Sequence, residues 1–265
     1  MTRITVVVPC YNDGTYLHEA IESALKQDHE DIEVIVSDDG SSDTQTLRAL
    51  DALPDLGVKV MRGAHAGVSA ARNAAIEAAT GDYILPLDAD DRLAPDFASA
   101  AGRVLDSDVS IGVVGCGTEL FGSSNAVVHP RTPHPTDWLV SNQLPVTALF
   151  RRSDWRACGG YPLDLRWGED WYFWVKLVAL GRGVTVLPMI GLHYRQRPDQ
   201  VTSHVPWDIQ ENTRGNVLRA GLPIVNSYPV EATTLLAAHL NQLQAVRERR
   251  SERLRTRIVS MARRG

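Results

Sequence analysis

Residues 1–91 alternate short apolar runs with segments in which apolar side chains recur every three or four positions. Continuous Val and Ile runs indicate strands covered on both faces, and the three-to-four spacing indicates helices. The pattern predicts strands at residues 4–8, 32–37, 58–61 and 83–87, and helices at 16–25, 44–53 and 68–79. Strands that alternate with helices in this way are typical of a parallel sheet with crossover helices. We therefore expect an α/β fold with a mostly parallel sheet flanked by helices.

From residue 92 onward the pattern is less regular. It predicts helices at 95–105, 169–180, 207–220 and 230–264, and strands at 111–116, 146–150, 184–187 and 190–194. A stretch rich in Pro, Ser and His at 122–135 predicts a long loop, and loops of this length are usually functional or disordered. We expect one domain at 1–205, made of two halves, 1–91 and 92–205, and a helical C-terminal extension at 206–265.

The composition is that of a soluble globular protein: 44% of the 265 residues are hydrophobic and 22% are charged. No run approaches the ~18 apolar residues of a membrane-spanning helix, and the N-terminal apolar stretch is too short for a signal peptide. The three cysteines are far apart and show no metal-ligand spacing, which fits a reducing compartment. We expect a cytoplasmic location.

Charge is distributed unevenly along the chain. Residues 1–246 carry 19 basic and 30 acidic side chains, so we expect no nucleic-acid partner. Residues 247–265 carry eight Arg and two Glu, and Leu254, Ile258 and Met261 fall at the spacing of one helix face. This basic amphipathic helix has three interpretations: peripheral contact with an anionic inner membrane face, a homo-oligomer interface, or a solvated extension.

Acidic side chains follow two of the predicted parallel strands. Asp-Asp-Gly occupies 38–40 and Asp-Ala-Asp-Asp occupies 88–91. Ligands of an open parallel sheet bind outside the carboxyl ends of its strands. Carboxylates gathered there repel one another unless a cation offsets them, and Mg²⁺ or Mn²⁺ bridging to substrate phosphates is the usual case. Each cluster alone could equally form turns or helix caps. Two clusters at equivalent strand ends favour the metal-dependent site.

Six segments resemble those of family-2 glycosyltransferases. They are Val-Val-Val-Pro-Cys-Tyr-Asn-Asp (6–13), Glu-Val-Ile-Val-Ser-Asp-Asp-Gly-Ser-Ser-Asp (33–43), Gly-Val-Ser-Ala-Ala-Arg-Asn (67–73), Gly-Asp-Tyr-Ile-Leu-Pro-Leu-Asp-Ala-Asp-Asp (81–91), Gly-Gly-Tyr (159–161) and Trp-Gly-Glu-Asp (167–170). The first four resemble the donor nucleotide-binding half and the last two the acceptor half of a glycosyltransferase A-type catalytic domain. The resemblance runs from about residue 3 to 203. The C-terminal extension lies outside it.

The resemblance implies a donor site for a nucleotide-sugar. Pro9, Tyr11 and Asp39 would surround the nucleotide base, with Asp39 accepting a hydrogen bond from a uracil-like edge. Arg72 would lie near the nucleotide or its phosphates, and Asp88 would contact the ribose. A uridine diphosphate donor is the first expectation, with thymidine or guanosine diphosphate sugars as alternatives.

The resemblance also implies a divalent metal, Mn²⁺ or Mg²⁺, bound by Asp90 of the Asp-X-Asp motif. His193, in Gly-Leu-His-Tyr-Arg, is a candidate third ligand, and His204 is a second candidate. Many relatives carry a histidine two residues after the Tyr-Arg pair, where this chain has Arg197. A histidine at a strand end can also be purely structural.

The acidic pair Glu169 and Asp170 would be catalytic, since the second member of this pair is the base in inverting members of the family. The predicted helix that follows, residues 171–180, is apolar nearly all round and therefore buried. Such a helix holds its first turn rigidly, as a catalytic carboxylate requires. Glu169 could instead only complement the helix dipole.

These features predict a hexosyl- or N-acetylhexosaminyltransferase that moves a sugar to an acceptor hydroxyl of a saccharide or glycoconjugate, with inversion. The alternative is a non-catalytic module of the same fold that binds a nucleotide-sugar or a glycan. Dinucleotide-dependent oxidoreductases and P-loop phosphotransferases are excluded because the chain lacks Gly-X-Gly-X-X-Gly after its first strand and lacks a Gly-Lys-Ser/Thr loop.

Overall fold

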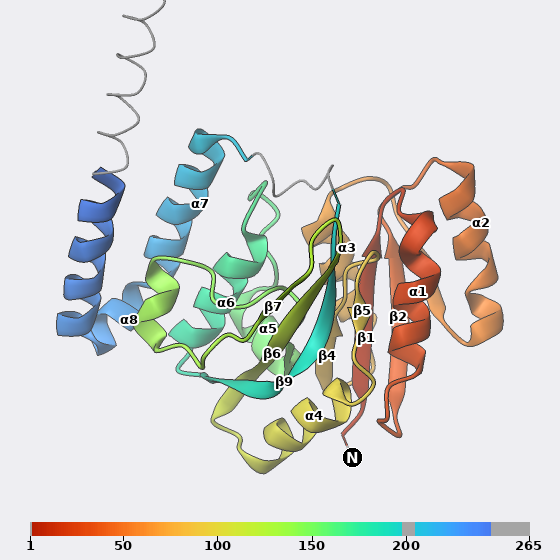
Figure 1. Cartoon of the computed structure of the whole chain (residues 1–265), viewed down its shortest axis with the longest axis horizontal. Coiled ribbons are helices and arrows are strands. Elements are labelled where there is room, and N and C mark those ends of the chain that lie inside the picture. Colours follow the sequence, from red (N-terminus) through yellow and green to blue (C-terminus); the bar gives the residue numbers. More distant parts are fainter. Residues whose placement is uncertain (1, 198–204, 245–265) are drawn as a thin grey trace, which may run out of the picture.

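The computed structural model describes residues 2–197 and 205–244. One nine-stranded sheet runs through the molecule in the order β3-β2-β1-β4-β8-β6-β9-β5, with β7 paired to β6 (Figure 1). The strands are β1 (Ile4–Cys10), β2 (Ile32–Asp38), β3 (Lys59–Arg62), β4 (Tyr83–Pro86), β5 (Arg92–Leu93), β6 (Ile111–Gly122), β7 (Ala126–Val128), β8 (Leu149–Arg151) and β9 (Gly183–Gln196). The helices are α1 (Gly14–Leu25), α2 (Thr44–Ala52), α3 (Val68–Glu77), α4 (Phe97–Ser107), α5 (Arg152–Cys158), α6 (Glu169–Ala179), α7 (Trp207–Ala220) and α8 (Leu222–Ser227), with short 3-10 turns η1 (Pro54–Leu56) and η2 (Pro135–Leu139).

The first four strands form the parallel sheet that the sequence predicts. β1 pairs in parallel with β2 and with β4, and β2 pairs in parallel with β3. Beyond β4 the sheet is mixed, because β8 is antiparallel to both β4 and β6, while β9 is parallel to β6. The α/β expectation is confirmed, with wholly parallel pairing among β1 to β4 and mixed pairing beyond them.

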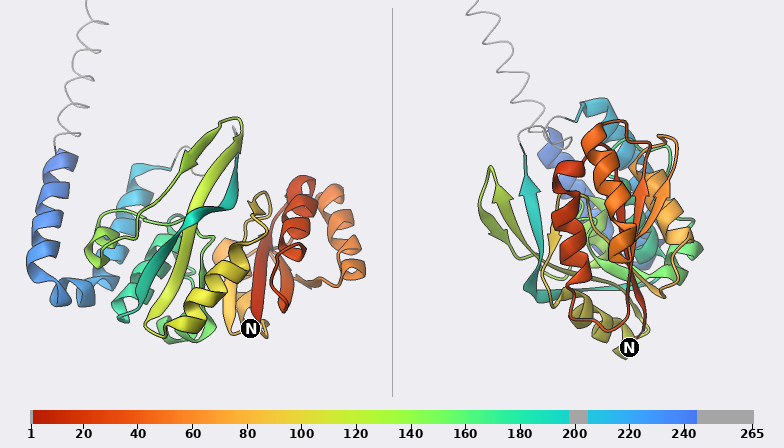
Figure 2. Two further views of the ribbon diagram at one scale, coloured as in Figure 1. Left: turned by 60° about the horizontal axis from the view of Figure 1, so that its bottom comes forward. Right: turned by 90° about the vertical axis from the view of Figure 1, so that its right-hand side faces the viewer.

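Two apolar cores cover the two faces of the sheet. Alternate residues of β1, such as Val6 and Val7, point to opposite faces, and both are fully buried. On one face α1, α2 and α4 pack against the strands, and on the other α3, α5 and α6 do so. Figure 2 shows these helices on either side of the sheet. Burial on both faces explains the continuous apolar runs in the sequence.

The second half of the sheet differs from the expected pattern most clearly at β7 and β9, while the sequence does not predict β5, and β8 begins three residues later than expected. β6 continues to Gly122 and forms a hairpin with β7, where the sequence predicts only a loop at 122–135. β9 is one strand of 14 residues instead of two short ones. Gly115 of β6 pairs with Val186, and Gly117 pairs with Ile190. Between these two pairs β9 therefore has three residues where β6 has one. The extra residues of β9 form a bulge that accommodates Pro188, which cannot donate to a ladder.

The C-terminal helices pack on the outside of α6. Val217 of α7, Ile224 of α8 and Ala232 belong to the second core, and the chain is helical from 229 to 244. The rest of the helix predicted at 230–264, with its basic amphipathic face, lies outside the described residues, as does His204. In the described part of the chain no helix is long and apolar enough to cross a membrane. The domain boundary at 205 stays a prediction.

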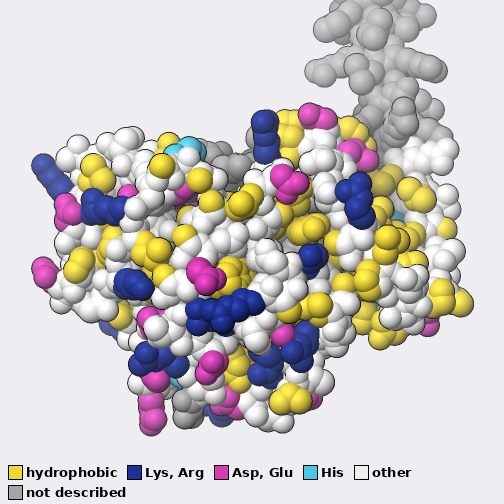
Figure 3. Space-filling view, turned by 180° about the vertical axis from the view of Figure 1, so that it is seen from behind, with side chains coloured by type: hydrophobic (Ala, Val, Ile, Leu, Met, Phe, Trp, Pro, Cys, Tyr) yellow, Lys and Arg dark blue, Asp and Glu magenta, His cyan; other side chains and the backbone are white. Residues whose placement is uncertain are grey.

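Large hydrophobic side chains remain exposed on these last helices. They include Trp207, Leu222, Val230 and Leu240. Figure 3 shows hydrophobic side chains gathered on this side of the molecule, whereas charged side chains are spread over the rest of the same view.

Candidate active site

The carboxyl ends of β1, β2 and β4 meet at one edge of the sheet, because these strands are parallel and in register. Cys10 lies opposite Asp38, and the Asp39 amide donates to the Cys10 carbonyl at 2.8 Å. Asn12, in the left-handed region at φ 55°, accepts two backbone hydrogen bonds from the loop after β2. The loops that follow β1 and β2 are therefore fixed to one another by hydrogen bonds.

A cavity of about 410 Å³ opens at this edge; we call it the donor-side cavity. All five predicted donor-binding residues line it, together with the predicted metal ligand: Pro9, Tyr11, Asp39, Arg72, Asp88 and Asp90. The structure thus brings together residues that are up to 81 positions apart in the sequence, from Pro9 to Asp90.

Asp39 is buried and organises the loop before α3. Its two carboxylate oxygens accept the backbone amides of Ala66 at 2.7 Å and Gly67 at 2.9 Å. The His65 ring lies 2.8 Å from the same carboxylate and stacks on Tyr11, with 4.2 Å between ring centroids. The oxygen that accepts the Gly67 amide also faces the His65 ring, whereas the oxygen that accepts the Ala66 amide has one partner and keeps a lone pair. The hydrogen bond to a base that the family resemblance implies for Asp39 is compatible with this geometry.

Arg72 is buried between two carboxylates. Its guanidinium lies 2.8 Å from Asp88 and 2.7 Å from Glu169, and its side chain is 4% exposed. The pKa of Arg72 is raised by these carboxylates against the opposing effect of burial, so the guanidinium stays charged. Arg72 therefore connects the Asp-X-Asp turn to the acidic pair on α6. The sequence does not predict its ion pair with Glu169.

Asn73, the next residue of the same motif, holds the segment after α5. Its side chain accepts from the Trp155 indole at 3.0 Å and the Tyr161 amide at 2.9 Å, and it donates to the Tyr161 carbonyl at 2.8 Å. Gly160 lies against it at φ 76°, and a Cβ there would come within 2.8 Å of the Asn73 side chain. This close approach explains why a glycine precedes Tyr161. The buried Tyr161 ring has its centroid 5.5 Å from the Arg72 guanidinium carbon.

The first turn of α6 presents the acidic pair. Gly168 caps the helix in the left-handed conformation at φ 70°, and a Cβ there would meet the Thr213 methyl group at 2.8 Å. Glu169 and Asp170 follow in the first turn, where a helix dipole favours negative charge. The rest of α6 is buried in the second core, as the sequence predicts.

A second cavity of about 540 Å³ lies beside the first; we call it the acceptor-side cavity. Asp170 lines it, and its carboxylate accepts hydrogen bonds from the Trp171 amide and the Asn142 side chain, both at 2.8 Å. Burial, followed by the charge of Glu169, raises the pKa of Asp170, and these two hydrogen bonds and Arg72 oppose that rise. The two cavities share five lining residues: Arg72, Asp88, Trp167, Glu169 and Tyr194.

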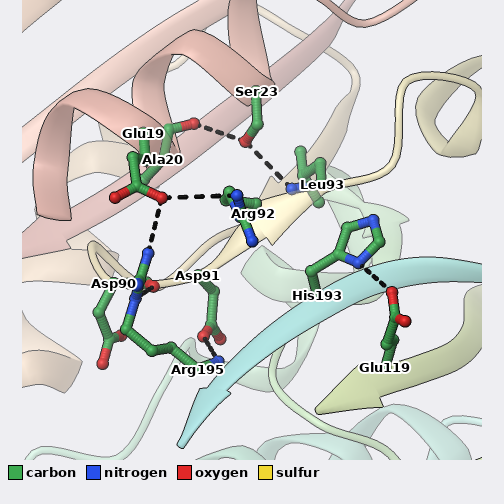
Figure 4. A network of polar contacts seen from close by, with 10 residues as sticks. All are labelled: Glu19, Ala20, Ser23, Asp90, Asp91, Arg92, Leu93, Glu119, His193 and Arg195. Atoms are coloured by element: carbon green, nitrogen blue, oxygen red, sulfur yellow. Dashed lines mark hydrogen bonds and ion pairs between the residues drawn. The ribbon is translucent and has the colours of Figure 1, made fainter. Parts of the chain in front are cut away.

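The Asp-X-Asp turn is crossed by two arginines from the end of β9. Arg197 reaches Asp90 at 3.1 Å and Asp13 at 2.8 Å. Arg195 donates its backbone amide to Asp91 at 2.7 Å and its side chain to the Asp90 carbonyl at 2.8 Å (Figure 4). Burial and the nearby Asp88 raise the pKa of Asp90 to about 6 and that of Asp91 to about 9. Burial and the crowding of carboxylates therefore disfavour the ionised forms of Asp90 and Asp91 even with the arginines present.

His193 does not lie with Asp90. Its Nδ1 is 2.7 Å from Glu119, and Figure 4 shows the ring turned toward that residue. Its neighbours in β9, Leu192 and Tyr194, line the acceptor-side cavity, so His193 points to the opposite face of the strand. No group of three or more His, Cys, Asp or Glu side chains within residues 2–197 and 205–244 could hold a metal by itself.

Sequence reasoning missed several residues of the site. Asn142 contacts Asp170 from a loop, and Asp13 and Arg197 flank Asp90. No spacing marks Asn142, since it lies in a polar loop far from any motif. The three described cysteines, Cys10, Cys116 and Cys158, are free and buried, and burial raises the pKa of each thiol, so they act as small core residues.

Comparison with known proteins agrees with this architecture. The sequence model described as Glycosyl transferase family 2 matches residues 5–157. The succinoglycan biosynthesis protein ExoO of Rhizobium meliloti (strain 1021) is 31% identical over 221 residues, which are 75% of this chain and 62% of ExoO, so the chain spans less than two thirds of that relative.

Two solved structures share the fold. S. aureus TarS 1-349 in complex with UDP-GlcNAc superposes with a TM-score of 0.65 at 19% identity, covering 85% of this chain and 73% of that one. The mannosyltransferase PcManGT from Pyrobaculum calidifontis, in complex with GDP-Man and Mn²⁺, gives a TM-score of 0.56 at 20% identity over 91% and 80% of the two chains. The glycosyltransferase A-type architecture expected from the sequence is confirmed, and the chain belongs to glycosyl transferase family 2.

Proposed function

We propose that this protein transfers a sugar from a uridine diphosphate sugar to a hydroxyl of a saccharide or glycoconjugate acceptor, with inversion at the anomeric carbon. The nucleotide occupies the donor-side cavity and the acceptor occupies the acceptor-side cavity. The observation that carries the proposal is the wall shared by the two cavities. Arg72, Asp88 and Glu169 lie in that wall, with Asp90 on the donor side and Asp170 on the acceptor side.

Asp170 is the general base in this proposal. Its carboxylate takes the proton of the acceptor hydroxyl while the acceptor oxygen forms its bond to the anomeric carbon, and the bond from that carbon to the diphosphate breaks. The raised pKa of Asp170 suits this task, because a base is most effective when its pKa approaches the working pH. Glu169 is held by Arg72 and orients the first turn of α6.

The residues around Asp90 fit a divalent metal. Asp90 would supply a hard oxygen ligand. The repulsion between Asp90 and Asp88, which contributes to the raised pKa of Asp90, would be relieved by a cation. Mg²⁺ and Mn²⁺ are usually bound by one or two carboxylates plus substrate phosphates, so a complete protein cage is not needed. Such an ion supplies positive charge for the departing diphosphate. Arg197, which lies 3.1 Å from Asp90, would share that carboxylate with it.

The choice of donor rests on the base subsite and on the relatives. Pro9 and the stacked rings of Tyr11 and His65 form an aromatic surface beside Asp39, which suits a flat base with a hydrogen-bonding edge. TarS was solved with UDP-GlcNAc and PcManGT with GDP-Man and Mn²⁺. ExoO is described as a succinoglycan biosynthesis protein. We propose a role in polysaccharide or glycoconjugate biosynthesis, with a UDP-sugar as the first donor to test.

The test is a panel of UDP-, GDP- and TDP-sugars with Mn²⁺ or Mg²⁺. Binding stabilises the folded protein, so the correct donor raises the melting temperature, and it then releases nucleoside diphosphate on turnover. Stabilisation without release, with acceptor mixtures of several saccharide classes present, would favour the non-catalytic binding module instead. An α-linked product from an α-linked donor would contradict inversion.

The basic segment at 247–265 is proposed to contact either an anionic membrane surface or a second copy of the chain, at the cytoplasmic face of the membrane. Deleting it should leave donor release intact and lower liposome binding or dimer formation. Unchanged binding and unchanged oligomeric state would reject both roles.

A further inference from the structure

Asn142 contacts the Asp170 carboxylate directly, and both residues line the acceptor-side cavity. Its Nδ2 donates to one carboxylate oxygen at 2.8 Å, while the backbone amide of Trp171 donates to the other at 2.8 Å. A carboxylate with one donor on each oxygen has a fixed rotation about its own axis and keeps a lone pair on each oxygen for an incoming proton.

The backbone on either side of Asn142 is fixed in the core. Leu139 and Leu144 are each 3% exposed, and the Trp171 indole donates to the Trp138 carbonyl at 2.7 Å, which ties this segment directly to the first turn of α6. The Gln143 amide closes the loop by donating to the carbonyls of Asp137 and Ser141. Asn142 is therefore presented to Asp170 by a segment that is joined to the first turn of α6.

We propose that Asn142 is a positioning residue that fixes the rotation of the Asp170 carboxylate and keeps it ionised beside the acceptor. This inference rests on the proposed function for its catalytic consequence, although the contact itself does not. Two other groups bear on the same carboxylate: Glu169 disfavours its ionised form and Arg72 favours it. The buried Tyr161 also interacts electrostatically with it, since the charge of Asp170 raises the pKa of Tyr161. Asn142 adds a hydrogen bond that favours the ionised form without adding charge.

The direct test is a ¹³C NMR titration of the full chain labelled at the aspartate carboxyl carbons, with no acceptor or donor added. The Asp170→Asn variant identifies the Asp170 signal. In Asn142→Ala the pKa of Asp170 should rise by about one pH unit, the low end of the effect of a hydrogen bond to a charged group, because water can replace the exposed amide. Asn142→Asp keeps the shape of the side chain, removes the hydrogen-bond donor and adds a like charge. The rise in the pKa of Asp170 should therefore be larger than in Asn142→Ala.

Asn216→Ala is the matched control. The Asn216 amide forms hydrogen bonds within its own helix, α7, and does not line the acceptor-side cavity. This variant should leave the Asp170 titration unchanged. In turnover, Asn142→Ala should move the acid limb of kcat/KM to higher pH by the same amount, whereas a merely structural loss would lower activity equally at every pH.

An Asp170 titration in Asn142→Ala and Asn142→Asp that matches wild type overturns the inference and leaves the proposed function standing. Full turnover in Asp170→Asn has the opposite meaning: the proposed function fails while the effect of Asn142 on the Asp170 titration stands. The two failures are therefore distinguishable.

Discussion

The donor-side and acceptor-side cavities share a wall, but their charged residues are held in place by different means. On the donor side, Asp39 and Asp88 follow parallel strands whose register is fixed by backbone hydrogen bonds. On the acceptor side, Asp170 is held by contacts between side chains and loops, from Asn142 and from the link between Trp171 and Trp138. Arg72 is the point at which the two sides depend on each other.

This difference predicts how substitutions behave. A donor-side carboxylate at a strand end can lose its charge without loss of its backbone support, so the expected defect is in binding or chemistry. A residue that joins the two sides contributes to the fold itself, because its removal leaves buried charges without partners.

The largest effect should follow Arg72→Gln. It leaves Asp88 and Glu169 without their shared cation, and breaking a buried ion pair costs about 3–5 kcal/mol. The carboxylates are 32% and 17% exposed on their side chains, so the loss should fall toward the lower end of that range. Urea denaturation measures the free energy of unfolding.

Arg62→Gln is the matched control for Arg72→Gln. Arg62 pairs with Asp51 at the surface, with side chains 45% and 70% exposed, and exposed pairs contribute about 0–1 kcal/mol. Equal losses in the two variants would show that Arg72 does not join the two sides energetically.

A smaller and local effect is expected for Asp90→Asn. The fold should survive, and the increase in donor affinity caused by Mn²⁺ should fall at least ~10-fold, since even the loss of a residue that only supports a metal ligand costs that much. Isothermal titration calorimetry with and without Mn²⁺ measures it.

Asp91→Asn is the control beside Asp90. Its pKa is raised to about 9, chiefly by burial, so Asp91 is already uncharged at pH 7 and asparagine changes its charge little. The same Mn²⁺ dependence in wild type and Asp90→Asn would reject Asp90 as the metal carboxylate.

The sequence predicts the donor side better than the acceptor side for the same physical reason. Hydrophobic runs locate β1, β2 and β4, and the carboxyl end of a parallel strand then locates Asp39 and Asp90 on one edge. By contrast, nothing in the local pattern reveals that β9 passes through Pro188 as one strand, or that His193 points away from the site. Those outcomes depend on pairing with β6, which is a property of the fold.

The same limit applies to individual partners. The motif around Arg72 indicates a site residue, but its ion pair with Glu169 joins positions 97 apart in the sequence. Asn142 lies in a loop that no periodicity describes, and its contact with Asp170 exists only because the core holds both segments. Residues placed by side-chain contacts therefore require the structure.

The most direct test of the account is the pH dependence of sugar transfer, or of donor hydrolysis by water, in wild type, Asp170→Asn and Glu169→Gln. Asp170 must be ionised to act as a base, and its pKa is raised. As the pH decreases, wild-type kcat/KM should therefore begin to fall at a pH above about 4, the ordinary pKa of a carboxyl group. Asp170→Asn should keep its donor affinity, lose roughly 10²–10⁴-fold in kcat and show no acid limb. Glu169→Gln should lose less and keep the limb. Transfer by Asp170→Asn within a few-fold of wild type, with the acid limb intact, would contradict the assignment of Asp170 as the base.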